Sequence, residues 1–140
     1  MRTIIATALG VALLGSPAAA QTRARGSQAA LAAMAQVGSP YVWGAASPHR
    51  GFDCSGLTQW AWRQAGVPIP RVSWAQLALH RVRHLRPGDL LGFYGGEHVG
   101  LYVGHGRFVH APNPRSRVRL DHLHGWYRNH MTWAVRPGKG

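Results

Sequence analysis

The feature that most constrains the fold is a change in the hydrophobic pattern near residue 80. Before it, apolar residues recur at spacings of three and four, which is typical of amphipathic helices. After it, short runs rich in β-branched and aromatic residues alternate with glycine-containing turns, which predicts antiparallel strands. Helices followed by strands indicate an α+β domain rather than an alternating α/β domain.

The same patterns predict the individual elements. Helices are expected at residues 27–37, 55–65 and 73–79, and Ser73 with Gln76 has the form of a capping box for the third. An irregular loop is expected between the first two helices. Strands are expected at residues 89–94, 98–103, 107–111, 117–120 and 132–136. We therefore expect N-terminal helices packed on an antiparallel sheet of five to six strands.

Residues 1–20 have the composition of a secretory signal peptide. Arg2 is followed by an uncharged apolar run from Thr3 to Leu14 and by alanines that end at Ala20. The run is shorter than the ~20 residues of a membrane-spanning helix. We expect cleavage after Ala20 and a secreted or periplasmic protein with no integral membrane segment. The alternative, a buried N-terminal core helix, would be interrupted by glycine and proline.

The rest of the chain is interpreted as one unit. Residues 21–26 are expected to form a flexible arm, and residues 27–140 a single domain. We expect this domain to be a monomer.

The chain is strongly basic, with 16 Lys and Arg against 4 Asp and Glu and a net charge of +12. Such a charge favours association with polyanions, including nucleic acid and the anionic polymers of a cell wall. Export and the absence of a nucleic-acid docking motif argue against nucleic acid and leave anionic wall polymers as an expected partner. Because the basic residues are scattered, a general solubilising charge explains them equally well.

The single cysteine, Cys54, is the first candidate for chemistry because it cannot form a disulfide within the chain. Asp53 before it can cap the helix that follows, which places the thiol at a helix N-terminus, where the dipole favours a thiolate. The negative charge of Asp53 opposes that effect, so we interpret Asp53 as a ligand for a substrate amine. The alternative is an inert, buried thiol.

Hairpin geometry selects two of the nine histidines. If residues 104–106 form a three-residue loop, His98 and His110 share one face of the sheet, and Gly100 lies across from His110 and leaves room for its imidazole. A two-residue loop would place the two histidines on opposite faces. In the first register His98 could accept the thiol proton while His110 orients it.

A metal site is the alternative use of these groups, with His98, His110 and either Asp53 or Cys54 as ligands. The thiol is explained without a metal, and the histidines have no tight helical spacing. We therefore expect neither a metal nor a cofactor.

Five segments, in this order along the chain, resemble the NlpC/p60 family of cell-wall peptidases. They are Gly38–Gly44, Gly51–Leu57, Pro70–Ser73, Arg86–Leu90 and His98–Gly104. The resemblance implies a papain-like fold. It also implies hydrolysis of peptidoglycan stem peptides between D-glutamate, linked through its γ-carboxyl, and a diamino acid, either meso-diaminopimelate or lysine.

The resemblance also implies roles for individual residues. Cys54 is the expected nucleophile, His98 its base and His110 the third polar group. The residues expected to line the cleft or contact substrate are Tyr41, Asp53, Ser55, Arg71 and Ser73. Two alternatives use the same fold: an amidase that separates glycan from peptide, and a non-catalytic module that binds the wall. The usual mark of the latter, loss of the cysteine or the base, is absent from this sequence.

Overall fold

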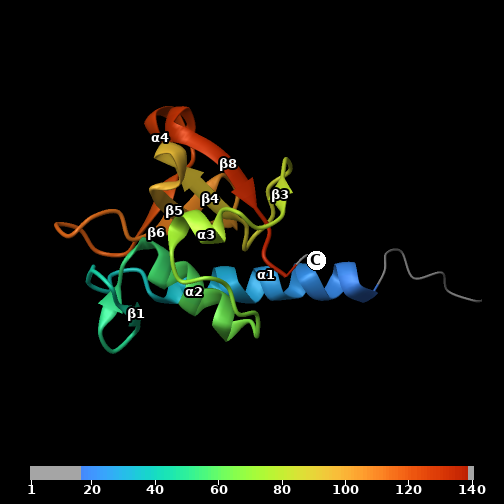
Figure 1. Ribbon diagram of the computed structural model, residues 1–140, viewed down its shortest axis with the longest axis horizontal. Coiled ribbons are helices and arrows are strands. Elements are labelled where there is room, and N and C mark those ends of the chain that lie inside the picture. Colours follow the sequence, from blue (N-terminus) through green and yellow to red (C-terminus); the bar gives the residue numbers. More distant parts are fainter. Residues whose placement is uncertain (1–16, 139–140) are drawn as a thin grey trace, which may run out of the picture.

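The computed structural model describes residues 17–138 and has two layers (Figure 1). Helices α1 (Pro17–Ala35) and α2 (Cys54–Gln64) lie side by side in one layer. An antiparallel sheet forms the second layer and packs on both helices. The predicted α+β class, with N-terminal helices on an antiparallel sheet, is confirmed.

The sheet has six strands in the order β3-β8-β4-β5-β6-β7. The strands are β3 (Arg81–Val82), β4 (Leu90–Phe93), β5 (His98–Gly104), β6 (Arg107–His110), β7 (Arg119–His122) and β8 (Met131–Val135). The predicted strands agree with β4, β5, β6 and β8 to within one residue at each end. In contrast, β7 lies two residues later than expected, and the short edge strand β3 was not among the predicted strands.

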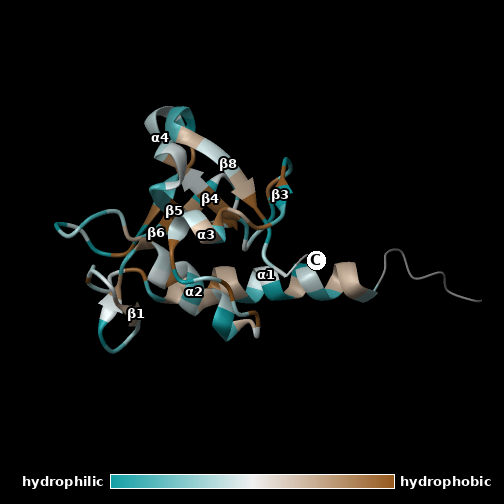
Figure 2. Ribbon diagram, in the orientation of Figure 1, coloured by the Kyte–Doolittle hydropathy of each residue, from teal (hydrophilic) through white to brown (hydrophobic). Residues whose placement is uncertain are grey.

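Side chains alternate between the two faces of the sheet, and the central strands β4, β5 and β6 are buried on both faces. In β4, Leu90 packs against α1 and α2 in the same core as Trp62, whereas Leu91 points to the opposite face. That second face holds Phe108 and is covered in part by α4 (Gly125–His130), a short helix that the sequence pattern did not predict. Figure 2 shows hydrophobic residues concentrated along these central strands.

Helix α1 begins ten residues earlier than expected, so the flexible arm predicted at residues 21–26 is wrong: this segment is helical. Gly26 is buried, and a Cβ there would overlap the carbonyl oxygen of Pro87. The close approach needs glycine, and it ties the first turns of the helix to the turn before β4. The segment is therefore part of the packed domain.

The predicted apolar run of the signal peptide, residues 3–14, lies outside the described residues. The expected cleavage point after Ala20 falls inside the first turn of α1. Within residues 17–138, no helix combines the length and the apolar character needed to cross a membrane.

The loop expected between α1 and α2 contains a small hairpin, formed by β1 (Ala46–Ser47) and β2 (Gly51–Phe52). Helix α3 (Ser73–Gln76) is shorter than predicted.

The capping box predicted for α3 is wrong, because Val72 is the N-cap and makes no side-chain cap. Instead, the Ser73 hydroxyl donates to the Gly96 carbonyl oxygen at 2.8 Å. Gln76 is fully buried, and its amide nitrogen donates to the carbonyl oxygen of Ser55 at 3.0 Å. These two side chains therefore fasten α3 to the start of α2 and to the loop before β5.

Candidate active site

Cys54 is the first residue of α2, and Asp53 is its N-cap, as predicted. One Asp53 oxygen accepts from the Gly56 N–H at 2.7 Å, and the other accepts from the Gly44 N–H at 2.9 Å. These bonds hold the helix start against the loop before β1. The thiol is therefore presented, half-buried, at a fixed helix N-terminus.

Arg71 completes the surroundings of Asp53. Its guanidinium donates to Asp53 Oδ2 at 2.9 Å and to the Ser55 hydroxyl at 2.9 Å. Burial opposes the charge of Asp53, but the donors Arg71, Gly56 and Gly44 outweigh it and hold the pKa of this carboxyl below its usual range. With four protein donors on about four acceptor positions, the expected contact to a substrate amine would require one of these bonds to open.

His98 and His110 lie together as expected: His98 Nε2 is 2.8 Å from His110 Nδ1. The predicted three-residue loop is wrong, since Gly104 pairs with Arg107 across a two-residue turn in which His105 has a φ of 54°. A bulge between residues 102 and 104 shifts the register and returns both histidines to one face. Gly100 is needed beside them, since a Cβ there would lie 2.8 Å from Phe108 Cδ2 and 3.3 Å from His110 Cβ.

Asp121 on β7 extends the histidine pair, and sequence reasoning missed it. His110 Nε2 lies 2.7 Å from Asp121 Oδ2, and Arg119 binds the same carboxylate at 2.8 Å. The predicted strand ended at residue 120, so it assigned Asp121 no partner. No local signal points to Asp121, because its contact with His110 depends on the register between β6 and β7.

The hydrogen bonds fix the proton positions on both rings. Burial opposes the charge of Asp121, but His110 and Arg119 outweigh it and keep the pKa of this carboxyl below its usual range, so it is an acceptor. His110 must then donate from Nε2, which leaves its Nδ1 as an acceptor for His98 Nε2–H. Because the proton of neutral His98 is on Nε2, its Nδ1 carries the free lone pair.

Both imidazoles are neutral near pH 7. Burial lowers the pKa of His98 to about 3, with a further contribution from His110. Burial also lowers the pKa of His110, against the opposing effect of Asp121. In the resting state, two neutral imidazoles, His98 and His110, are therefore hydrogen-bonded in series to the carboxylate of Asp121.

The expected lowering of the thiol pKa is wrong for this structure. Burial raises the pKa of Cys54, and the charge of Asp53 raises it further. The backbone N–H groups of Val99, Ser55 and Cys54 act in the opposite direction without overcoming burial. The contact with Val99, the residue after His98, places the sulfur against the first residues of β5. The resting state is thus a neutral thiol and a neutral His98 imidazole.

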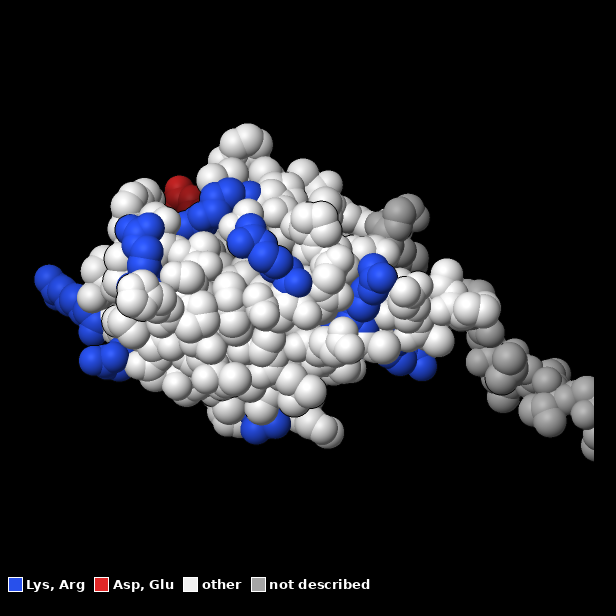
Figure 3. All heavy atoms as spheres, turned by 90° about the horizontal axis from the view of Figure 1, so that it is seen from below, with Lys and Arg blue, Asp and Glu red and all other residues white. Residues whose placement is uncertain are grey.

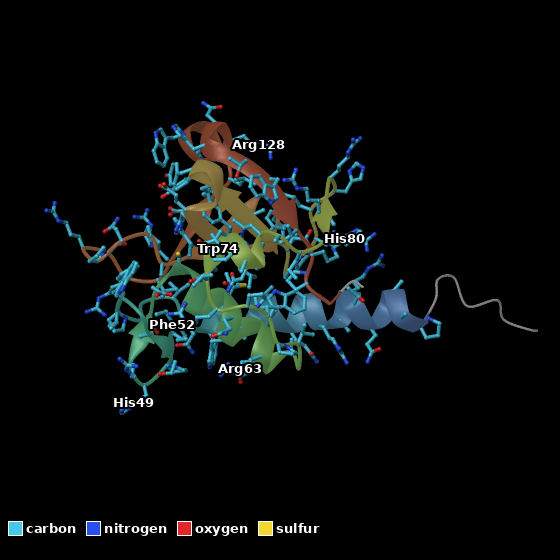
Figure 4. The ribbon with its side chains drawn as sticks, viewed as in Figure 1. His49, Phe52, Arg63, Trp74, His80 and Arg128 are labelled. Carbon is cyan, nitrogen blue, oxygen red and sulfur yellow. The ribbon has the colours of Figure 1, made fainter. Side chains whose placement is uncertain are left out.

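Two adjoining hollows form the cleft, and Cys54 lines both. The first, the Arg71 hollow, encloses about 440 Å³, and the second, the His98 hollow, about 350 Å³, sizes typical of small-ligand sites. Figure 4 labels Trp74, whose side chain on α3 lines the Arg71 hollow. The structure brings all the predicted site residues to these hollows; the Arg71 hollow contains Tyr41, Asp53, Ser55, Arg71 and Ser73, and the His98 hollow contains Tyr41, His98 and His110.

The basic residues do not gather in the cleft: among the described residues that line its two hollows, Arg71 is the one Lys or Arg. Figure 3 shows Lys and Arg side chains spread around the face seen from below, with a broad uncharged area between them. In Figure 4 the labelled Arg63, His80 and Arg128 point away from the molecule on different sides. On the face seen in Figure 3, the basic side chains are therefore spread out rather than gathered in one patch. Within the described part of the chain, no group of three His, Cys, Asp or Glu side chains is arranged to hold a metal ion.

A thiol at a helix N-terminus, lining one hollow with two histidines of an antiparallel sheet, places this chain in the papain-like class of α+β domains. The model of the NlpC/P60 family matches residues 38–137, and the chain belongs to that family. This finding confirms the family resemblance inferred from the five sequence segments.

Individual relatives agree with the assignment. A probable endopeptidase of Corynebacterium glutamicum is 45% identical over 121 residues, covering 80% of this chain and 57% of its own length. The murein DD-endopeptidase MepH of Escherichia coli is 34% identical over 115 residues, covering 74% and 42%. The solved structure of the peptidoglycan hydrolase RipB of Mycobacterium tuberculosis has a TM-score of 0.73 and 32% identity, covering 91% and 74%. The chain thus spans about half the length of the two curated relatives.

Proposed function

We propose that this chain is an exported cysteine endopeptidase that cuts peptidoglycan stem peptides between γ-linked D-glutamate and the diamino acid. The observation that carries the proposal is the thiol of Cys54 in one cleft with His98, whose unprotonated Nδ1 is set by the hydrogen bonds to His110 and Asp121. The endopeptidase and peptidoglycan hydrolase names of the relatives support the substrate class. Export rests on the N-terminal sequence pattern.

The first half of the reaction forms a thioester. His98 Nδ1 takes the proton from the Cys54 thiol as the sulfur attacks the scissile carbonyl carbon. Asp121, through His110, stabilises the positive charge that develops on His98. The carbonyl oxygen becomes an oxyanion that can accept from the Cys54 backbone N–H and from the Tyr41 hydroxyl. Burial raises the pKa of Tyr41, as do the neighbouring Cys54 and Asp53, so its hydroxyl stays a donor.

The second half releases both products. The C–N bond breaks as His98 returns its proton to the leaving amine of the diamino acid. A water molecule then attacks the thioester, its proton goes to His98 and then to the departing sulfur, and the free γ-carboxyl is released.

This proton transfer assigns the two hollows. Because His98 must reach the leaving amine, the diamino acid occupies the His98 hollow. The acyl half, which ends in D-glutamate, occupies the Arg71 hollow. Arg71, whose side chain is one-third exposed, is the cation there that can meet the free α-carboxylate of the D-glutamyl residue.

The test is the identity of the products. Defined tri- and tetrapeptides carrying either diamino acid are incubated with the protein, and the fragments are identified by mass. We expect L-alanyl-D-glutamate and a free diamino acid or its C-terminal peptide. Release at the D-alanine bond, as the name of the E. coli relative describes, or separation of peptide from glycan would contradict the proposed bond.

A matched pair of histidine variants separates catalysis from general effects. His98→Ala should lose turnover, whereas His49→Ala should keep it, because His49 is exposed at the turn between β1 and β2, away from the cleft (Figure 4). If both variants cut at the wild-type rate, the proposed base is wrong. A non-catalytic wall-binding module would show no turnover with the wild-type protein either.

The charge is proposed to hold the enzyme near anionic wall polymers. Binding to purified sacculi should then weaken as salt is raised, since screening shortens the reach of surface charges. Binding that is independent of salt would exclude this role.

A further inference from the structure

Glu97 differs from the other acidic residues because it has no partner. Of the four acids in the sequence, Asp53, Asp89 and Asp121 each form an ion pair with an arginine. In the part of the chain that the structure describes, Glu97 makes no hydrogen bond or ion pair, and it is exposed. A protein with a net charge of +12 thus leaves one carboxylate unneutralised at its cleft.

The surroundings of Glu97 suit a cation. Among the described residues lining the His98 hollow, Glu97 is the one Asp, Glu, Lys or Arg side chain, and His98 and His110 are neutral. Aromatic side chains line the same hollow: the centroid of the Tyr94 ring lies 5.5 Å from that of Trp126, and the centroid of Trp126 lies 5.3 Å from that of Tyr127. An ammonium group beside a carboxylate gains further stabilisation from aromatic faces.

The backbone that carries Glu97 is held in an uncommon conformation. It follows η1 (Tyr94–Gly96), whose three residues all have positive φ, including 54° at the non-glycine Tyr94. The Ser73 hydroxyl donates to the Gly96 carbonyl oxygen at 2.8 Å and fixes the loop to α3. A strained loop that is pinned in this way at a cleft is typical of a site that positions a functional group.

We infer that Glu97 binds the free ω-ammonium group of the diamino acid in the His98 hollow. The inference rests on the proposed function, which places the leaving diamino acid there. Lysine and meso-diaminopimelate share this ammonium group when the stem peptide is not cross-linked, and a cross-link at that nitrogen removes its charge. Glu97 therefore makes the enzyme prefer stem peptides whose ω-amine is free.

The test compares L-alanyl-γ-D-glutamyl-L-lysine with the same peptide acetylated at the lysine ω-amine, and the matching meso-diaminopimelate pair. Acetylation should lower kcat/KM of the wild-type protein roughly three- to tenfold, as expected for a partly exposed ion pair with an aromatic wall. In Glu97→Gln the ratio between free and acetylated peptides should fall to about one, and Glu97→Asp should restore part of it. Thermal unfolding of each variant checks its fold.

The substrate carries a second ammonium group, at the N-terminus of L-alanine, so a third peptide is acetylated there. If only that change lowers kcat/KM in a way that depends on Glu97, the inferred site is wrong. The same conclusion follows if wild-type and Glu97→Gln proteins show equal ratios while cutting the peptides, although the proposed function then stands. If the wild-type protein cuts none of the peptides, the proposed function and this inference both fail.

Discussion

His110 Nε2 lies 2.7 Å from Asp121 Oδ2, and this contact determines which nitrogen of His98 can act as a base. Asp121 is an acceptor, so it fixes the proton on His110 Nε2, and His110 in turn fixes the proton on His98 Nε2. The two strands that carry these residues, β6 and β7, pair directly in the sheet. The orientation of His98 therefore depends on the register between β6 and β7, because this register brings Asp121 to His110.

Asp121→Asn tests this arrangement. The amide can donate to His110 Nε2 and reverse the proton order along the pair, so we expect kcat to fall about ten- to hundredfold with KM nearly unchanged. Arg119→Gln keeps the carboxylate and should cost only about a few-fold, since Arg119 is exposed. Steady-state kinetics measure both. A kcat of Asp121→Asn equal to that of the wild type would show that Asp121 does not orient the pair.

The pH profile follows from the pKa of His98, which burial and His110 lower to about 3. The base works as neutral imidazole, so activity should be lost only as the pH falls through that value. Burial raises the pKa of Cys54, so the thiol keeps its proton above neutral pH as well. We expect kcat/KM to vary by less than about twofold between about pH 5 and 8. An acid limb centred near 6.5, the ordinary value for histidine, would contradict this environment of His98.

A buried ion pair joins Asp89, the residue before β4, to Arg136, the residue after β8. Arg136 Nε donates to Asp89 Oδ1 at 2.9 Å, and Asp89 is 1% exposed. Asp89→Asn leaves the Arg136 charge without its partner, so the free energy of unfolding should fall by about 3–5 kcal/mol. Urea unfolding measures the loss. The matched acid-to-amide control, Glu97→Gln, should change stability by about 0.5 kcal/mol or less, because Glu97 has no partner among the described residues.

The first turns of α1 provide a further stability test. A chain that starts at residue 27 loses the buried Gly26 and its contact with Pro87, whereas a chain that starts at residue 21 keeps both. We expect the shorter chain to be less stable by about 1 kcal/mol or more. Equal unfolding midpoints for the two chains would mean that residues 21–26 behave as a loose arm after all.

Local pattern predicted much of this fold. The spacing of apolar residues placed α2, and alternating residues between turn signals placed β4, β5, β6 and β8, because each of these elements buries one face or both. The N-cap of α2, Asp53, was also predictable, since capping depends only on neighbours in the sequence. Helix α4 was missed because its six residues are too few to show a helical repeat, although Tyr127 packs against the sheet.

The features of the site that the sequence did not predict correctly depend on contacts between residues far apart in the chain. The bulge between residues 102 and 104 made the predicted face correct although the predicted loop was wrong. The link to Asp121 needed the register between β6 and β7, which no local signal provides. The pKa of Cys54 followed from burial by the sheet, which outweighs the helix N-terminus that the sequence revealed.

The most direct measurement is the rate at which Cys54→Ala releases the diamino acid from a defined stem tripeptide, compared with the wild-type protein. Cys54 is half-buried, and alanine keeps its Cβ, so the variant should fold with a melting temperature close to that of the wild type. We expect no release above the buffer rate. Release at the wild-type rate by a folded Cys54→Ala protein would contradict it.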